Sequence, residues 1–223
     1  MNEEGKRSCL PTNIVDVFKK ISVDITWLHA RWIIYKQLFG ISQKRIDLLF
    51  SCAPAFFYLV HQILLDDMLL ALNRLAEPAD KPPHGNLSLE QIAIRLRDDG
   101  HKVLIDSLYE KLEVFREQCR PFAPHRHKRI AHRDLRISLN SDAEPLPGIS
   151  RQMIDDALAS VRDYMNTVEG HFCNSKTAYD YFGMIGDADA LISHLAEGLR
   201  YEELRRSGSL RFDDMNKSKW HDA

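Results

Sequence analysis

The sequence has no C-x-x-C cysteine pair, no glycine-rich phosphate-binding loop and no alternating apolar run typical of a β-strand. Its four cysteines, Cys9, Cys52, Cys119 and Cys173, are scattered along the chain. This pattern argues against a structural zinc site and against a disulfide framework, and it favours a reducing cytoplasm. The N-terminus lacks the apolar core of a secretory signal. The most apolar stretch, residues 48–60, is shorter than the roughly 20 apolar residues of a membrane span. We therefore expect a cytoplasmic protein that does not enter a membrane.

An overall basic charge is also absent. The 30 lysines and arginines are balanced by 32 aspartates and glutamates, which gives a formal charge of −2. Positive charge is instead concentrated between Arg120 and Arg136, where six arginines and lysines face a single acid, Asp134. This excludes a uniformly basic nucleic-acid binder and directs attention to one local site.

The apolar residues of the first forty positions predict one long helix. They recur at alternating spacings of four and three, and they are Ile14, Phe18, Ile21, Ile25, Leu28, Trp32, Tyr35 and Phe39. Asn13 offers an N-cap, and Gly40 ends the pattern. A second helical region follows at 42–76, in which Pro54 predicts a kink or a split. Because the connection between the two is short, we expect an antiparallel hairpin.

Apolar periodicity and capping residues predict four more helices, at 88–97, 101–120, 150–172 and 187–206. Ser150 and Asp187 are the expected N-caps of the last two. The apolar face of the helix at 101–120 comprises Leu104, Leu108, Leu112, Phe115 and Cys119. That of the helix at 150–172 comprises Ile154, Ala157, Leu158, Val161, Met165, Val168 and Phe172. Ser88 with Gln91 has the spacing of a capping box. Pro121 and Pro124 are expected to stop the helix at 101–120 immediately before the basic stretch. The sequence thus predicts an all-α bundle with antiparallel long N-terminal helices and additional C-terminal helices. We expect a single domain over residues 1–206 and a loosely held tail over 207–223.

The stretch from His125 to Leu135 has the residue types for metal-free RNA cleavage. That reaction needs a base for the 2′-hydroxyl proton, an acid for the departing 5′-oxygen and cations for the charged phosphorane. Histidine suits the first two tasks because its ordinary pKa lies near neutrality. Arginine suits the third because its planar, permanently charged fork matches phosphate oxygens.

Helix geometry limits how these residues can cooperate. On one regular helix, Arg126 and His132 lie about 120° apart. They can reach the same point only if Arg126 sits in an irregular entry after Pro124, or if a second subunit completes the site. Metal ligation by His125, His127 and His132 is a weaker alternative, because only one carboxylate is nearby. We expect no cofactor.

The string from Arg126 to His132 resembles the Arg-polar-x-x-x-x-His signature of HEPN domains (higher eukaryotes and prokaryotes nucleotide-binding). Residues 128–135 and the order of the elements are similar to the abortive-infection, AbiU-like branch of these domains. That order comprises two long N-terminal helices, Asn73-Arg74-Leu75, a Pro/Gly loop, Asn86-Leu87-Ser88-Leu89 and then the motif. The resemblance spans roughly residues 14–200.

The resemblance implies a metal-independent endoribonuclease, of toxin or phage-defence type, that acts as a homodimer with two facing motifs. Arg126 would stabilise the transition state, and His132 would be the acid and base. His127 fills a position where asparagine is commoner. His127, Lys128, Arg129 and Arg133 would bind RNA. An antitoxin protein is a possible second partner.

Other interpretations remain open from the sequence. The basic helix 125–136 could bind nucleic acid or a partner without cleaving, or it could be a solvated surface. Arg74 is either a family position or the partner of Glu77 in a salt bridge. Cys119 and Cys173 carry no sign of nucleophilic activation and are interpreted as packing residues.

Overall fold

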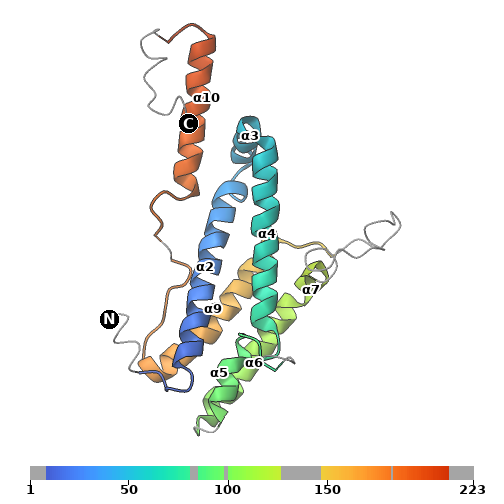
Figure 1. Cartoon of the computed structure of the whole chain (residues 1–223), viewed down its shortest axis with the longest axis vertical. Coiled ribbons are helices and arrows are strands. Elements are labelled where there is room, and N and C mark those ends of the chain that lie inside the picture. Colours follow the sequence, from blue (N-terminus) through green and yellow to red (C-terminus); the bar gives the residue numbers. More distant parts are fainter. Residues whose placement is uncertain (1–8, 81–84, 98–99, 127–146, 182, 211–223) are drawn as a thin grey trace, which may run out of the picture. The chain divides into compact units, whose positions relative to one another are not determined.

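The computed structural model describes residues 9–80, 85–97, 100–126, 147–181 and 183–210. Over these ranges the regular structure is entirely helical, with no strand (Figure 1). The all-α prediction is confirmed.

Helix α2, Val15–Phe39, follows the predicted pattern closely. All eight apolar residues of its stripe are buried, with exposed fractions between 0% and 8%. The backbone N–H of Gly40 donates to the carbonyl of Lys36 at 2.7 Å and closes the last turn. A local spacing rule was therefore enough to locate this helix and its buried face.

The second helical region is split at the predicted proline. Helix α3 spans Gln43–Cys52 and begins at Ser42, whose hydroxyl accepts from the backbone N–H of Arg45. Ala53 has a non-helical backbone, with φ −155° and ψ 76°, and Pro54 is the first residue of α4, Pro54–Ala76. Proline is tolerated at that position because the first residues of a helix have no intrahelical partner for their N–H groups.

The chain forms two compact units. Unit 1 comprises Met1–Trp32 and Leu64–Phe182, and unit 2 comprises Ile33–Ile63 and Gly183–Ala223. Both α2 and α4 begin in one unit and end in the other. Unit 1 also contains helices α5 (Glu90–Arg95), α6 (Lys102–Cys119), η2 (Arg120–Phe122), α7 (Ala123–His125) and α9 (Arg151–Cys173). Unit 2 contains α3 and α10 (Ala188–Arg206). The predicted boundary between domain and tail at residue 206 stays a prediction.

The core of unit 1 is centred on the packed pair α6 and α9 (Figure 1). The apolar face predicted for α6 is buried, and so is that of α9 except for Phe172, which is half-buried. The two helices are antiparallel: the rings of His101, before α6, and His171, at the end of α9, lie 5.2 Å apart. Trp32 of α2 joins this pair by donating its indole N–H to Asp155 at 2.7 Å.

The capping box predicted at Ser88 and Gln91 is wrong. Helix α5 begins at Glu90, and its first turn has no side-chain cap. Gln91 instead donates its amide to the carbonyls of Ala79, at 3.2 Å, and Asn86, at 3.0 Å. The side chain that would have closed the box is occupied in holding the preceding loop.

Unit 2 contains the predicted cap of the last helix. The Asp187 carboxylate accepts from the backbone N–H groups of Asp189 and Ala190, at 3.1 and 3.3 Å. Gln37 of α2 donates to the same carboxylate at 2.7 Å, and Arg45 of α3 forms an ion pair with Asp189. The hydrogen bond from Gln37, followed by that from Ala190, holds the pKa of Asp187 below its ordinary value.

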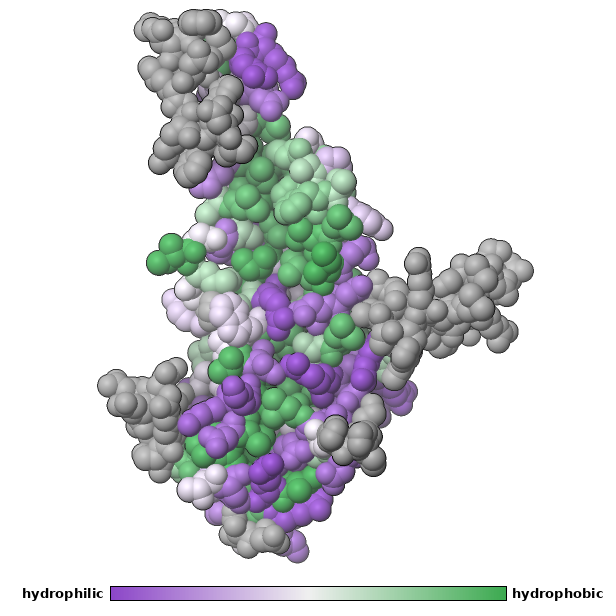
Figure 2. All heavy atoms as spheres, viewed as in Figure 1, coloured by the Kyte–Doolittle hydropathy of each residue, from purple (hydrophilic) through white to green (hydrophobic). Residues whose placement is uncertain are grey.

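Helix α4 has an unusually apolar surface in unit 2. Phe56, Tyr58, Leu59 and Ile63 are each more than half exposed. Figure 2 shows hydrophobic residues gathered over α3 and the N-terminal half of α4. By length and composition alone, α4 is the one helix among the described residues that could cross a membrane, which is weak support for a span. Its C-terminal half lies in the core of unit 1, as in an ordinary buried helix.

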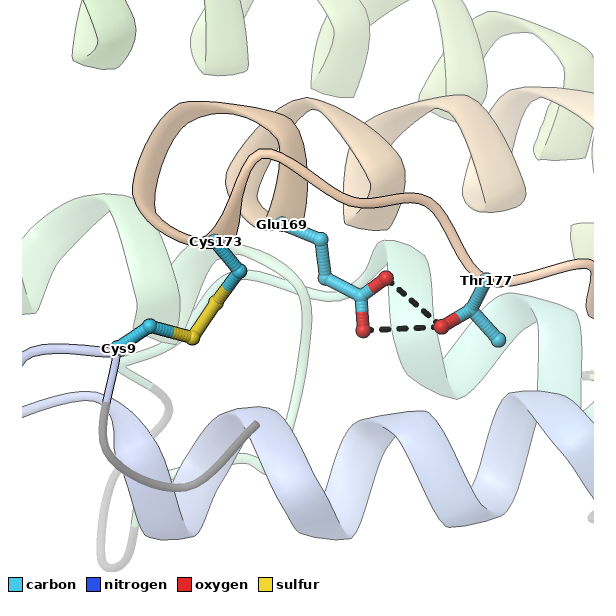
Figure 3. The surroundings of a disulfide bond; sticks show 4 residues. All are labelled: Cys9, Glu169, Cys173 and Thr177. Atoms are coloured by element: carbon cyan, nitrogen blue, oxygen red, sulfur yellow. Dashed lines mark hydrogen bonds between the residues drawn. A yellow bond between two sulfur atoms is a disulfide. The ribbon is translucent and has the colours of Figure 1, made fainter. Parts of the chain in front are cut away.

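Two of the cysteines are joined, although their scattered positions argued against a disulfide framework and predicted Cys173 as a packing residue. Cys9 and Cys173 form a disulfide with their Cα atoms 5.3 Å apart (Figure 3). The prediction failed because pairing depends on tertiary proximity, and these residues are 164 positions apart. Cys173 is therefore not simply a packing residue. Cys119 is one, since it is buried and burial raises its pKa to about 12.

Candidate functional site

Arg126, the first residue of the predicted motif, lies at the end of a helical run that begins with α6. Helix α6 ends at Cys119, before Pro121, as predicted. The chain then stays helical through the 3-10 turn η2 and through α7, which contains Pro124. Arg126 itself has helical backbone angles, φ −56° and ψ −53°. Arg126 therefore does not sit in an irregular entry after Pro124, and that option from the sequence is wrong. The two prolines end α6 but not the helical run, because each occupies a first-turn position where no N–H donor is needed.

The guanidinium of Arg126 forms an ion pair with the carboxylate of Glu77. Glu77 follows the C-terminus of α4, so this contact links the end of α4 to the end of α7. The side chains are 25% and 13% exposed, respectively. A pair this far removed from solvent is less screened than a surface pair, and a fixed carboxylate orients a planar guanidinium.

Glu77 is itself held by Asn86. The side-chain amide of Asn86 donates to Glu77 at 3.0 Å and to the carbonyl of Pro78 at 3.1 Å. Its backbone N–H donates to the carbonyl of Ala79 at 2.8 Å. Asn86 thus fixes both the carboxylate and the turn that carries it.

A second arginine braces the same loop from α6. The Nε of Arg116 donates to the carbonyl of Ala76 at 3.1 Å, and its Nη2 lies 3.2 Å from Glu90. Glu90 also accepts from the backbone N–H of Ala79 at 2.8 Å. The loop that presents Glu77 is therefore cross-linked at several points, and Glu77 has little freedom to move away from Arg126.

His125, the residue before Arg126, contacts the segment that leads into α9. Its Nε2 donates to the carbonyl of Pro147 at 2.7 Å, which ties α7 to the entry of α9. Metal ligation by His125, His127 and His132 was an alternative from the sequence. Within the part of the chain that the structure describes, no group of three or more His, Cys, Asp or Glu side chains is arranged to hold a metal ion.

The remaining residues of the predicted site lie outside the described residues, and these are His127, Lys128, Arg129, His132 and Arg133. Their geometry relative to Arg126 stays a prediction.

Glu77 and Asn86 were not predicted as site residues. Of the two interpretations of Arg74, the salt bridge with Glu77 is wrong: Arg74 pairs with Asp24 at 2.6 Å, while Glu77 pairs with Arg126. For Glu77 and Asn86, the only sequence signal that they belong to the site was the occurrence of Asn86 in a string that resembles the family.

The profile of the HEPN family described as AbiU2 matches residues 12–191, which is most of the chain and includes the whole motif. No curated protein matches the sequence. No solved structure matches it either.

Proposed function

Because this chain belongs to the AbiU2 family of HEPN domains, we propose that it is a metal-independent endoribonuclease of the abortive-infection type. One observation carries the proposal: Arg126, the first residue of the signature, is held in a fixed, partly buried ion pair at the end of the α6–α7 run. An arginine that only solubilised a surface helix would need no such support. The proposed setting is the cytoplasm, with an antitoxin protein as restraint.

In the proposed reaction, the 2′-oxygen of RNA attacks the adjacent phosphorus and the 5′-oxygen leaves. His132 takes the 2′-hydroxyl proton or delivers a proton to the 5′-oxygen. Arg126 stabilises the additional negative charge on the phosphorane oxygens. The products are a 2′,3′-cyclic phosphate and a 5′-hydroxyl. DNA is not a substrate because it lacks the attacking hydroxyl.

We assign Glu77 the role of a positioning residue. Its carboxylate engages one edge of the Arg126 guanidinium, and the remaining N–H groups are available for phosphate. Asn86 and the braced loop keep this carboxylate in place before substrate arrives. Such preorganisation lowers the cost of orienting Arg126 in the transition state.

The proposed active form is a homodimer with two copies of the motif. Two considerations support it. A regular helix would hold Arg126 and His132 about 120° apart, so a second copy offers a way to complete the site. The exposed residues Phe56, Leu59 and Ile63 also form an apolar stripe on α4, spaced three and four positions apart. Such a stripe suits packing against another helix.

The experiment is cleavage of a labelled single-stranded RNA in the presence of EDTA. We expect wild-type protein to yield cyclic-phosphate ends. Arg126→Ala and His132→Ala should each reduce the rate by about 10²- to 10⁴-fold. Arg120→Ala is the matched control: Arg120 lies in the same helical run, is 79% exposed and pairs only with Glu117 among the described contacts.

Two results would contradict the proposal. One is the absence of cleavage by wild-type protein across a range of RNA sequences. The other is cleavage that persists in both Arg126→Ala and His132→Ala, which would indicate a contaminating nuclease. Salt-sensitive RNA binding without cleavage would instead favour the non-catalytic module that uses helix 125–136.

A further inference from the structure

A second chemically reactive feature of the molecule is the cysteine pair in unit 1. Cys9 precedes α2, and Cys173 is the last residue of α9. Both residues are half-buried, and we expect small oxidants and reductants to reach them. Their Cα separation of 5.3 Å lies within the range that an ordinary disulfide spans.

The Cys173 side of the pair is held in place by contacts that do not involve sulfur. Asn174 is the C-cap of α9 and has a left-handed backbone with φ 46°. The next residues turn back along the helix, where Asn166 donates to the carbonyl of Thr177 at 3.1 Å and accepts from its N–H at 2.8 Å. The Thr177 hydroxyl lies 2.7 and 3.0 Å from the two oxygens of the buried Glu169 (Figure 3).

The Cys9 side is anchored independently. Leu10 is buried beside it, and the carbonyl of Pro11 accepts from the N–H groups of Ile14 and Val15 at the start of α2. Asn13 donates its side-chain amide to the carbonyl of Arg95 in α5. Because none of these contacts involves a sulfur atom, we expect them to persist after reduction and to keep the two thiols close together. Closure is then an intramolecular reaction with a high effective concentration.

We propose that Cys9 and Cys173 are a reversible oxidation site, closed by a peroxide and opened by a dithiol, that staples the N-terminal segment to the end of α9. One thiolate attacks hydrogen peroxide, forms a sulfenic acid and releases hydroxide. The second thiolate attacks that sulfur and displaces a second hydroxide, which forms the S–S bond. Two thiols lose two electrons in total, and with the thiol protons the peroxide becomes two waters.

The other two cysteines do not share these properties. Burial raises the pKa of Cys119 to about 12, which keeps it as an unreactive thiol. Cys52 is half-buried in unit 2 and is a free cysteine. Selective oxidation is therefore expected at the Cys9–Cys173 pair. Cys52 supplies the matched control, because it has comparable exposure without a nearby thiol in the described structure.

The Cys9–Cys173 disulfide and the proposed nuclease site lie at opposite ends of α6. His101, before the first turn of α6, contacts His171 two residues before Cys173, whereas Arg126 lies beyond the other end of α6, directly after α7. The 18 residues of α6 span about 27 Å at a rise of ~1.5 Å per residue. The inference concerns stability of unit 1, and it does not depend on the proposed nuclease function.

The test compares wild-type full-length protein after dithiol treatment and after stoichiometric hydrogen peroxide. We expect non-reducing peptide mapping to show a Cys9–Cys173 cross-link only in the peroxide sample. Cys119 should be alkylated only after denaturation. The oxidised protein should melt about 5–10 °C higher, because the bond closes a very long loop in the unfolded chain.

The variants complete the test. Cys9→Ser should melt at the reduced temperature under both conditions, and Cys52→Ser should respond as the wild type does. The proposal is overturned if peroxide leaves both Cys9 and Cys173 open to alkylation, if Cys52 is the main oxidised residue, or if closure changes the melting temperature by less than about 1 °C. Since the wild-type measurements need no substitution, they decide the matter even if Cys9→Ser does not fold.

Discussion

The side-chain amide of Asn86 donates a hydrogen bond of 3.0 Å to the Glu77 carboxylate that pairs with Arg126. The loop between α4 and α5 therefore does more than connect two helices, because it positions a side chain of the proposed site. Its own hydrogen bonds fix a carboxylate, and that carboxylate fixes the arginine of the signature. A loop that only joined two helices would not need a side chain that bonds the carboxylate and the turn together.

Substitution Glu77→Gln tests this positioning role with almost no change of shape. The neutral amide removes the charge that orients Arg126, and we expect RNA cleavage to fall roughly tenfold to a hundredfold while the protein remains folded. The measurement is the initial rate on a fluorogenic RNA, together with a melting curve. Glu117→Gln is the control, since Glu117 is 68% exposed and pairs with Arg120 at the surface. A Glu77→Gln protein with the wild-type rate, alongside an inactive Arg126→Ala protein, would show that Glu77 has no part in the reaction.

Packing between α6 and α9 is expected to dominate the stability of unit 1. Leu108 is fully buried on the α6 face that meets α9, so Leu108→Ala should lower the free energy of unfolding by about 2–5 kcal/mol. Urea denaturation followed by far-UV circular dichroism measures the loss. Val103→Ala on the same helix is the control, because Val103 is 86% exposed and its truncation removes little buried surface. Equal effects of the two substitutions would refute this account of the core.

Most predictions that depend on neighbouring residues were confirmed, and the capping box at Ser88 and Gln91 is the exception, because Gln91 is used to hold the preceding loop. The stripe of α2, the split at Pro54 and the caps at Ser150 and Asp187 all depend on residues within a few positions of one another, and all were predicted. Spacing rules apply to such contacts because the helix itself determines which residues are neighbours.

The unpredicted features join residues that are far apart in the chain. Glu77 pairs with Arg126, and Cys9 pairs with Cys173, through the way helices pack and not through a local rule. Arg74 was an equally reasonable partner for Glu77 because it lies three positions away. Only the arrangement of α2 beside α4, which brings Asp24 to Arg74, separates the two possibilities. A single sequence does not show which of two possible ion-pair partners the folded chain brings closer.

The cap of α10 should give unit 2 a stability that depends on acid pH. The pKa of Asp187 is depressed in the folded state, so the unfolded chain binds a proton more readily. Its contribution is therefore present above the ordinary carboxyl pKa and is lost as the pH falls through the folded value. Carbon-detected NMR titration should give Asp187 a pKa below the ordinary value of an aspartate. Asp187→Asn keeps a capping oxygen without the titration, so its stability should fall less between pH 5 and pH 3. An Asp187 that titrates at or above the ordinary aspartate value would contradict the prediction.

The apolar stripe of α4 provides the test of self-association. Ile63 is 64% exposed in the described chain, and a charge in the centre of a helix–helix contact is strongly unfavourable. We expect wild-type protein to have about twice the 25.8 kDa mass of one chain in light scattering. Ile63→Asp should shift it to the single-chain mass without lowering the melting temperature of unit 1. Val103→Asp is the control, because Val103 is even more exposed but lies outside the stripe. A wild-type protein that is monomeric in solution and binds lipid vesicles through Ile63 would assign the stripe to a membrane surface and remove its support for a dimer.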